Sequence, residues 1–102
     1  MDVDETLRTA IAERRLVSFD LDGYPRIGEP HDYGVIKGVR QLFFYQVGGK
    51  SRSGRPIGWR TAMISKVSGM KILERRFAGP RPTLSGRHKE WDELIASVSR
   101  QS

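Results

Sequence analysis

The chain lacks cysteine altogether, and it has only two histidines, His31 and His88, among its 102 residues. The absence of cysteine excludes disulfides, thiolate metal sites and cysteine nucleophiles, and it favours a reducing compartment. The histidines are far apart in the sequence, so we expect no metal site, because zinc needs three or four clustered ligands. Ser51, Ser53 and His31 show no nucleophile-and-base pattern, so we also expect neither catalysis nor a cofactor.

Long apolar runs are missing as well. No segment approaches the roughly 18 apolar residues of a membrane span, and the acidic start, MDVDETLRTA, does not resemble a signal peptide. We therefore expect a cytoplasmic protein without a membrane partner. The length fits a single domain over residues 1–102, and a hydrophobic share of 37% indicates a small core rather than disorder.

Acidic residues are absent from the middle of the chain. None occurs between Asp32 and Glu74, whereas eight cations do: Lys37, Arg40, Lys50, Arg52, Arg55, Arg60, Lys66 and Lys71. Such a field of one sign attracts anions, and nucleic acid is the commonest large anion of the cytosol. The alternative is a solvated basic surface that keeps the protein soluble.

The N-terminal segment predicts a helix over residues 2–15. Asp2 is a suitable N-cap, and Glu5 stands three residues later, as in a capping box. Apolar residues then recur at helical spacing on one face: Val3, Leu7, Ala10 and Ile11. This stripe must be buried, and a sheet is the expected partner.

Residues 16–78 predict five or six short antiparallel strands. Val17, Phe19 and Leu21 alternate with polar residues, and Asp22-Gly23 is a hairpin signal. A second strand should run from about Pro25 to Pro30, where the proline interrupts the pairing. Three further strands are expected in QLFFYQV (41–47), IGWRTAMIS (57–65) and GMKILERRF (69–77). Short strands with glycine turns favour a small closed or nearly closed barrel, which leaves no exposed edge.

The C-terminal part predicts a second amphipathic helix, over about residues 86–99. Trp91, Leu94, Ile95 and Val98 recur at i, i+3, i+4 and i+7. This helix would pack on the barrel or on the first helix. In the alternative, it and the aromatic strand would form a surface for a protein partner or for a homodimer.

Several segments together resemble a known family. In order along the chain, TAIAERRLVSFDL, PRIGEP, QLFFYQV, GWRTAMISKV and MKILERRF are similar to the WYL domain, a module best known from bacterial transcription regulators. The resemblance covers about two-thirds of the chain. The triplet that names the family falls on Leu42, Phe43 and Phe44, and Lys66 stands where the family usually has arginine.

The resemblance implies an Sm-like or SH3-like β-barrel that follows an N-terminal helix. It also implies that a positively charged face senses a nucleotide or a nucleic acid, with Arg26, Phe43, Arg60 and Lys66 as ligand-face residues by position. We expect a standalone domain without the usual helix-turn-helix. A separate DNA-binding protein is therefore a candidate partner.

The chemistry of the side chains also favours a phosphate-bearing ligand. A guanidinium is a planar fork that can bind phosphate through two hydrogen bonds, whereas Lys66 would act as a point charge. The alternative for the arginines is a structural ion pair: Asp20 or Asp22 for Arg26, and Glu29 or Asp32 for Arg60. Lys66 could equally be an ordinary surface lysine.

The segment GGKSRSGRP supplies Lys50, Arg52 and Arg55 as candidate nucleic-acid contacts, because glycine lets backbone amides approach an anion. It lacks the spacing of a Walker loop, and a hairpin tip kept soluble by charge is the alternative. Trp59 and Phe43 could stack on a base or belong to the core. The sequence thus predicts a non-catalytic module that binds a nucleotide or single-stranded nucleic acid, with a protein-interaction module as the alternative.

Overall fold

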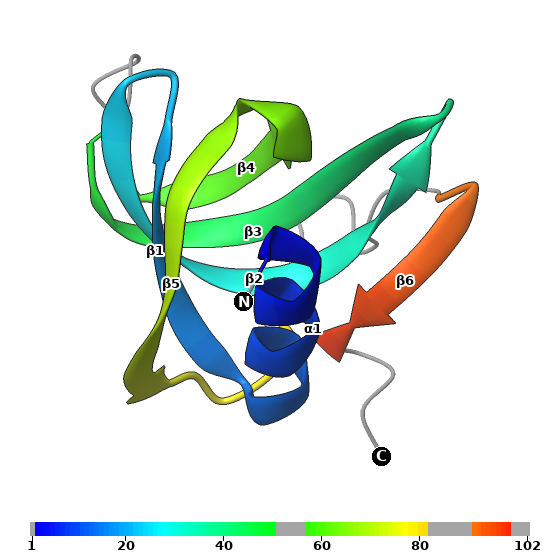
Figure 1. The fold of residues 1–102 in the computed structure, drawn as a ribbon. Helices are drawn as coiled ribbons and strands as arrows, with labels where there is room; N and C mark the ends of the chain where they lie inside the picture. Colours follow the sequence, from blue (N-terminus) through cyan, green and yellow to red (C-terminus); the bar gives the residue numbers. More distant parts are fainter. Residues whose placement is uncertain (1, 51–56, 82–90, 99–102) are drawn as a thin grey trace.

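The computed structural model describes residues 2–50, 57–81 and 91–98. The elements are, in order, α1 (Val3–Glu13), β1 (Arg15–Leu21), β2 (Tyr24–Ile36), β3 (Val39–Gly49), β4 (Gly58–Met63), the short 3-10 helix η1 (Ile64–Lys66), β5 (Val67–Arg76) and β6 (Glu93–Ser97) (Figure 1). Among these residues, no helix has the length and apolar character needed to cross a membrane.

The predicted N-terminal helix is confirmed, and α1 is slightly shorter than predicted. The side chain of Asp2 caps it by accepting a hydrogen bond of 2.8 Å from the backbone N–H of Glu5. The helix ends at Arg14, which adopts a left-handed conformation with φ 54°. Leu7 and Ile11, both from the predicted stripe, are fully buried.

An antiparallel sheet of order β4-β3-β2-β1-β5 makes up most of the molecule. The predicted hairpin is confirmed, because Asp22 and Gly23 join β1 to β2 with φ values of 55° and 79°. The predicted end of β2 at Pro30 is wrong. A register shift between Pro30 and Asp32 forms a bulge, after which the pairing with β3 resumes and continues to Ile36.

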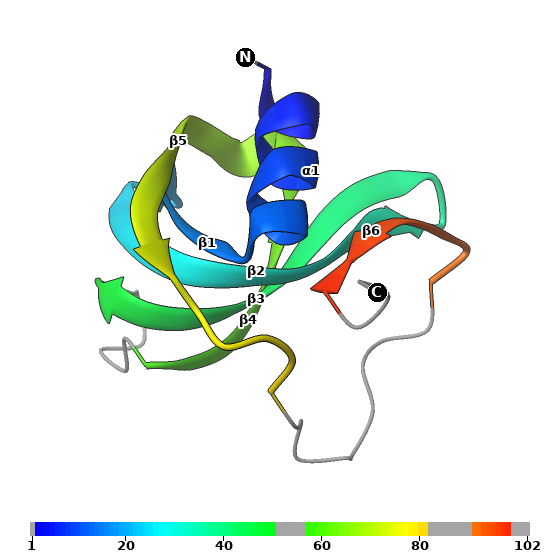
Figure 2. The same cartoon turned by 90° about the horizontal axis from the view of Figure 1, so that it is seen from below.

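The sheet is open, so the expectation of a closed barrel is wrong. β4 and β5 lie at the two ends of the strand order, and no ladder joins them within the described residues. The sheet curves around α1, which packs against its concave face (Figures 1 and 2). The apolar stripe of α1 therefore covers the core that closure of a barrel would otherwise cover.

The predicted C-terminal helix is also wrong, because residues 93–97 form β6, which pairs with the second half of β2 (Figure 2). The other end of β2 is paired with β1, which reaches only to Gly28. Without β6, the backbone groups of residues 32–35 would form an open edge. Gly34 makes room for this arrangement, since a Cβ there would lie only 2.8 Å from Trp91 Cε3.

The two faces of the sheet differ. Leu42 and Phe44 are fully buried on the inner face, together with Val17 and Phe19 of β1. Phe44 lies so close to Gly28 that a Cβ at residue 28 would meet its ring at 2.6 Å. Successive side chains of a strand point to opposite faces, so Phe43 and Tyr45 lie on the outer face, where they are partly exposed.

Candidate anion-binding site

The structure divides the predicted ligand residues between the two faces of the sheet. Arg60 pairs in register with Phe44 and so shares the inner face with the core, and Arg26 is buried on the same face. Trp59 and Phe43 lie on the outer face, where their rings stack at 4.5 Å with an interplanar angle of 6°. The rings expected to receive a base therefore contact each other.

Arg26 is a buried cation whose hydrogen-bond partners are neutral. The residue is 4% exposed. Its guanidinium donates to Gln46 Oε1 at 3.1 Å and to the carbonyl oxygen of Leu21 at 3.3 Å. Its Nε is buried and has no hydrogen-bond partner. Within the described residues Arg26 forms no ion pair with Asp20, Asp22 or any other carboxylate, so the structural alternative for this arginine is not seen.

The electrostatic surroundings of Arg26 disfavour its positive charge. Burial lowers the pKa of Arg26, and the nearby charge of Arg60 lowers it further, while Asp22 and Tyr24 act in the opposite direction. The ring of Tyr24 lies 6.0 Å from the guanidinium carbon, at the outer limit of a cation–π contact. The two arginines thus form a concentration of positive charge at one end of the inner face.

Lys50 is attached directly to this region. Its backbone N–H donates to the carbonyl oxygen of Pro25 at 2.7 Å, and its own carbonyl oxygen accepts from Gln46 Nε2 at 3.1 Å. Gln46 therefore links Arg26 to Lys50. We call Arg26, Gln46, Lys50 and Arg60 the basic end of the sheet. Two other predicted contacts, Arg52 and Arg55, follow Lys50 in the sequence but lie outside the described residues.

Lys66 lies near the basic end without belonging to it. It is exposed at the end of η1, and the next residue, Val67, pairs with Leu21 of β1. Leu21 in turn accepts a hydrogen bond from Arg26. The register therefore brings Lys66 to the same end of β1, but on the surface rather than beside the buried arginines.

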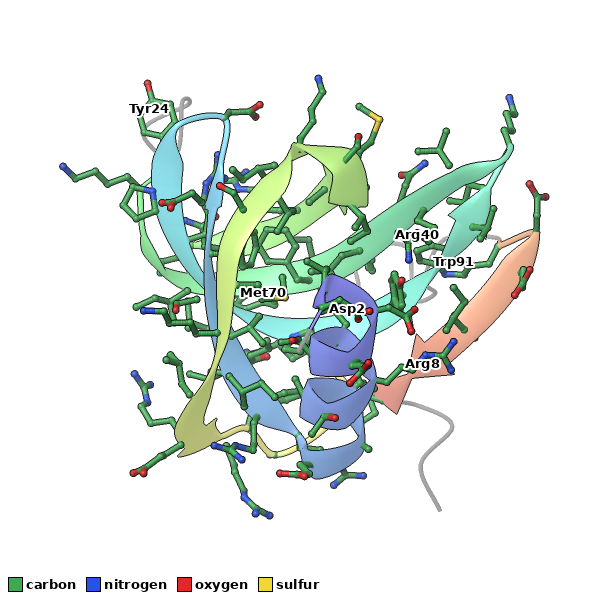
Figure 3. The ribbon with its side chains drawn as sticks, viewed as in Figure 1. Asp2, Arg8, Tyr24, Arg40, Met70 and Trp91 are labelled. Carbon is green, nitrogen blue, oxygen red and sulfur yellow. The ribbon has the colours of Figure 1, made fainter. Side chains whose placement is uncertain are left out.

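Two cavities differ in their chemistry. One of about 290 Å³ adjoins the basic end, and its lining includes Arg26, Gly49, Lys71 and Asp20. A larger one, of about 540 Å³, lies beside the N-terminus of α1, and its lining includes Asp2, Asp4, Val39 and Arg40. Figure 3 shows the labelled Tyr24 at the β1–β2 hairpin, away from Arg40 and Trp91.

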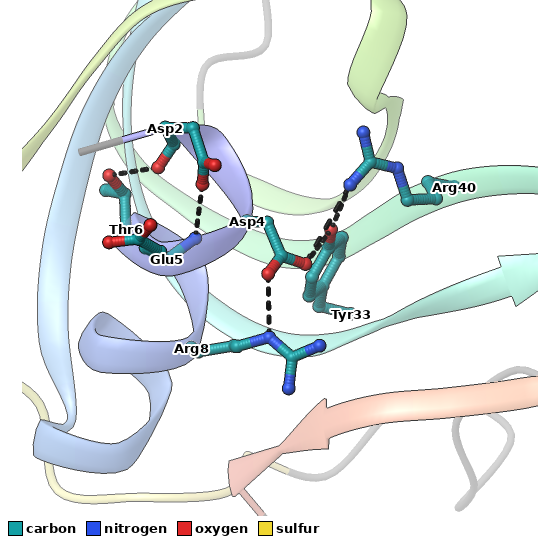
Figure 4. Close-up of polar contacts among 7 residues, drawn as sticks. All are labelled: Asp2, Asp4, Glu5, Thr6, Arg8, Tyr33 and Arg40. Carbon is teal, nitrogen blue, oxygen red and sulfur yellow. Dashed lines mark hydrogen bonds and ion pairs between the residues drawn. The ribbon is translucent and has the colours of Figure 1, made fainter.

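The larger cavity suits a phosphate less well than the basic end does, because its lining has two carboxylates, Asp2 and Asp4, and one cation, Arg40. Asp4 accepts hydrogen bonds from Tyr33 Oη at 2.7 Å and from Arg8 Nε at 2.8 Å, and Arg40 donates to the same tyrosine oxygen at 2.9 Å (Figure 4). These hydrogen bonds hold the pKa of Asp4 below its ordinary value. Asp4 therefore stays negative and contributes a carboxylate that repels anions.

The outer face carries a network that sequence reasoning missed. Glu29, which is 5% exposed, accepts two hydrogen bonds from Arg81, at 2.6 and 3.0 Å. His31 Nε2 lies 3.2 Å from Glu29 Oε1, and the histidine ring packs edge-on against Trp59 at 4.8 Å. Glu29 is thus engaged by Arg81 rather than by Arg60. No local pattern links two residues that are 52 positions apart, so the sequence offered no signal for this pair.

The charge of Glu29 is stabilised in spite of its burial. Burial alone would raise its pKa, but the hydrogen bonds from Arg81 and His31 outweigh this effect and lower the pKa below its ordinary value. The hydrogen bond with Glu29 in turn raises the pKa of the Arg81 guanidinium, so the positive charge of Arg81 is stabilised as well. This network holds the segment after β5 against the outer face.

The site shows no grouping suited to a metal ion, because in the described part of the chain no three histidine or acidic side chains come together. Comparisons of the chain with protein-family models, with curated proteins and with solved structures found no match. The resemblance to the WYL family therefore stays a prediction, and the basic end has to be interpreted from its own chemistry.

Proposed function

We propose that this protein is a non-catalytic module that binds a phosphate-bearing ligand, a nucleotide or a single-stranded oligonucleotide, at the basic end. The observation that carries the proposal is the burial of Arg26 with neutral partners and an unused Nε donor. A buried charge is costly unless an opposite charge compensates it. A phosphate oxygen at this Nε would supply that charge and would also reduce the repulsion between Arg26 and Arg60.

Further features support a ligand with several phosphates. Lys50 is exposed beside Arg26, and the sequence continues with Arg52 and Arg55. No acidic residue occurs in the sequence between Asp32 and Glu74, and the carboxylates near this field, Asp20 and Asp22, come from β1 and the turn that follows it. The resemblance to WYL domains, whose ligand face is basic, agrees with this proposal. Binding should therefore weaken as the salt concentration rises.

The alternative, a protein-interaction module, depended on a C-terminal helix and on an exposed aromatic strand. Residues 93–97 instead pair with β2, and Val98 is 1% exposed. On the outer face, Arg81 lies over the ring of Tyr45 at 4.1 Å. The two features on which this alternative depended are therefore a strand that pairs with β2 and a tyrosine ring that Arg81 contacts.

The proposal is tested by fluorescence anisotropy with labelled single-stranded DNA and RNA and with a labelled cyclic dinucleotide, each at several salt concentrations. Arg26→Gln and Arg60→Ala are compared with Arg75→Ala, which removes the same charge. Arg75 is exposed and lies near the far end of β5, where Arg76 pairs with Arg15. All three variants are first checked for folding by circular dichroism.

We expect Arg26→Gln and Arg60→Ala to weaken binding about tenfold or more, since a charge-assisted hydrogen bond contributes about 1.5–3 kcal/mol and a factor of ten corresponds to about 1.4 kcal/mol. Arg75→Ala should change the affinity by only a small factor. Equal losses in all three variants would mean that net charge alone governs binding. No binding by the wild type at low salt would refute the proposal.

A further inference from the structure

We propose that Glu29 and Tyr45 form a binding site for a guanine base on the outer face of the sheet, and that Arg81 occupies this site in the free protein. Glu29 and Tyr45 are cross-strand neighbours on β2 and β3. Their face is opposite to the one that carries Arg26 and Arg60. The inference therefore concerns a separate site and does not depend on phosphate binding at the basic end.

The geometry around Arg81 defines the site. Arg81 Nε donates to Glu29 Oε1 at 2.6 Å, and its NH2 group donates to Oε2 at 3.0 Å. The guanidinium carbon lies 4.1 Å from the centroid of the Tyr45 ring. Glu29 and Tyr45 together accept a flat group that offers two neighbouring N–H donors along one edge and an aromatic contact on its face.

Guanine matches this description better than the other bases do. Its Watson–Crick edge presents the N1–H and the 2-amino group side by side, and these two donors resemble one edge of a guanidinium. Adenine and cytosine present a donor beside an acceptor, and uracil flanks its single N–H with two carbonyl oxygens. Proteins that read unpaired bases combine hydrogen bonds to this edge with stacking on an aromatic ring.

The carboxylate is held in place independently of Arg81. Its side chain is 7% exposed, and His31 contacts Oε1 from the protein interior. His31 is itself fully buried between Trp59, at 4.8 Å, and Phe77, at 5.3 Å. Glu29 is therefore fixed before a ligand arrives, which reduces the entropic cost of binding.

Arg81 approaches this carboxylate from the solvent side. Its side chain is 44% exposed, so the bonds that it makes can be exchanged for those of another flat donor without opening the core. A ligand can bind only while Arg81 is out of the site. Its apparent affinity is therefore the intrinsic affinity multiplied by the fraction of time for which the site is vacant. Removal of Arg81 should therefore raise the affinity for guanine.

The test uses guanosine, which has no phosphate, and follows the two tryptophan indole N–H signals by two-dimensional NMR. Trp59 is the reporter, since Tyr45 packs edge-on against it at 5.4 Å, and Trp91 is the internal control. The proteins are the full-length wild type, Arg81→Ala, and Arg81→Ala combined with Glu29→Gln. Inosine is the matched ligand control, because it lacks only the 2-amino group. Methylguanidine carries the same guanidinium group as Arg81. Its binding to Arg81→Ala shows that the emptied site is still intact.

We expect Arg81→Ala to bind guanosine at least tenfold more tightly than the wild type does, and at least tenfold more tightly than it binds inosine. The double variant should lose this preference, whereas Arg75→Ala added to Arg81→Ala should leave it unchanged. If Arg81→Ala does not fold, Arg81→Gln replaces it, because a glutamine offers only one donor group to Glu29. Equal affinities for guanosine and inosine, or a folded variant that binds methylguanidine but not guanosine, would overturn the inference.

Discussion

Substitution of Arg81 by alanine should destabilise the protein through the charge that it leaves behind. The substitution removes two charge-assisted hydrogen bonds from Glu29, which would contribute about 3–6 kcal/mol together if fully buried. The side chain of Arg81 is 44% exposed, whereas that of Glu29 is 7% exposed. Because solvent screens the exposed partner, we reduce the expected loss to about 2–3 kcal/mol.

The stability lost in Arg81→Ala should depend on pH and should be smaller in acid. Arg81 and His31 lower the pKa of Glu29 in the folded protein, so this carboxylate stabilises the fold above its unfolded pKa of about 4.3. The contribution disappears as the pH falls through the folded pKa. In Arg81→Ala, burial is opposed only by His31, so the pKa of Glu29 should rise. The deficit should therefore be largest near neutral pH and should shrink below about pH 4.

Urea denaturation of the wild type, Arg81→Ala, Glu29→Gln and the double variant, at pH 7 and at pH 3.5, measures this coupling as a double-mutant cycle. At pH 7 the expected loss corresponds to a lower melting temperature by roughly 10–20 °C for a domain of this size. A loss below about 0.5 kcal/mol at pH 7, or one that is the same at both pH values, would refute the reasoning about this ion pair.

Two other substitutions test the packing and the helix cap. Gly28→Ala should cost about 1–3 kcal/mol, because the added methyl group would lie 2.6 Å from the ring of Phe44. Gly48→Ala is its control, since the nearest atom there is 3.7 Å away, and a loss as large as that of Gly28→Ala would contradict the packing. Asp2→Ala should cost about 1 kcal/mol through loss of the bond to the Glu5 N–H, as measured by urea denaturation, and an unchanged midpoint would show that the cap contributes nothing.

Local signals in the sequence were sufficient for α1 and for the first hairpin. The capping residue Asp2, the alternation of Val17, Phe19 and Leu21, and Asp22-Gly23 each act over a few residues, and the structure follows them. The signal of residues 91–98 was misleading, because their spacing suits a helix. Pairing with the uncovered edge of β2 makes these residues a strand instead, and this edge is uncovered because β1 pairs with β2 only as far as Gly28.

The candidate site was predictable only in part. The resemblance to the WYL family suggested Arg26 and Arg60 by position, but the split of the predicted ligand residues between the two faces became visible only when the register of β3 was known. The pairing of Phe43 with Trp59 and of Glu29 with Arg81 joins residues that are 16 and 52 positions apart. Such contacts depend on the tertiary fold, and one sequence contains no periodic signal for them.

The proposed function depends most directly on the buried guanidinium of Arg26. The most direct measurement is a titration of the isotopically labelled protein with inorganic pyrophosphate, in which NMR follows the arginine Nε–H signals at low salt. We predict that the Nε–H signal of Arg26 shifts in a saturable manner together with that of Arg60, while the signal of Arg75 does not move. An unchanged Arg26 signal, with small and similar shifts of the other arginine signals, would contradict the proposed function.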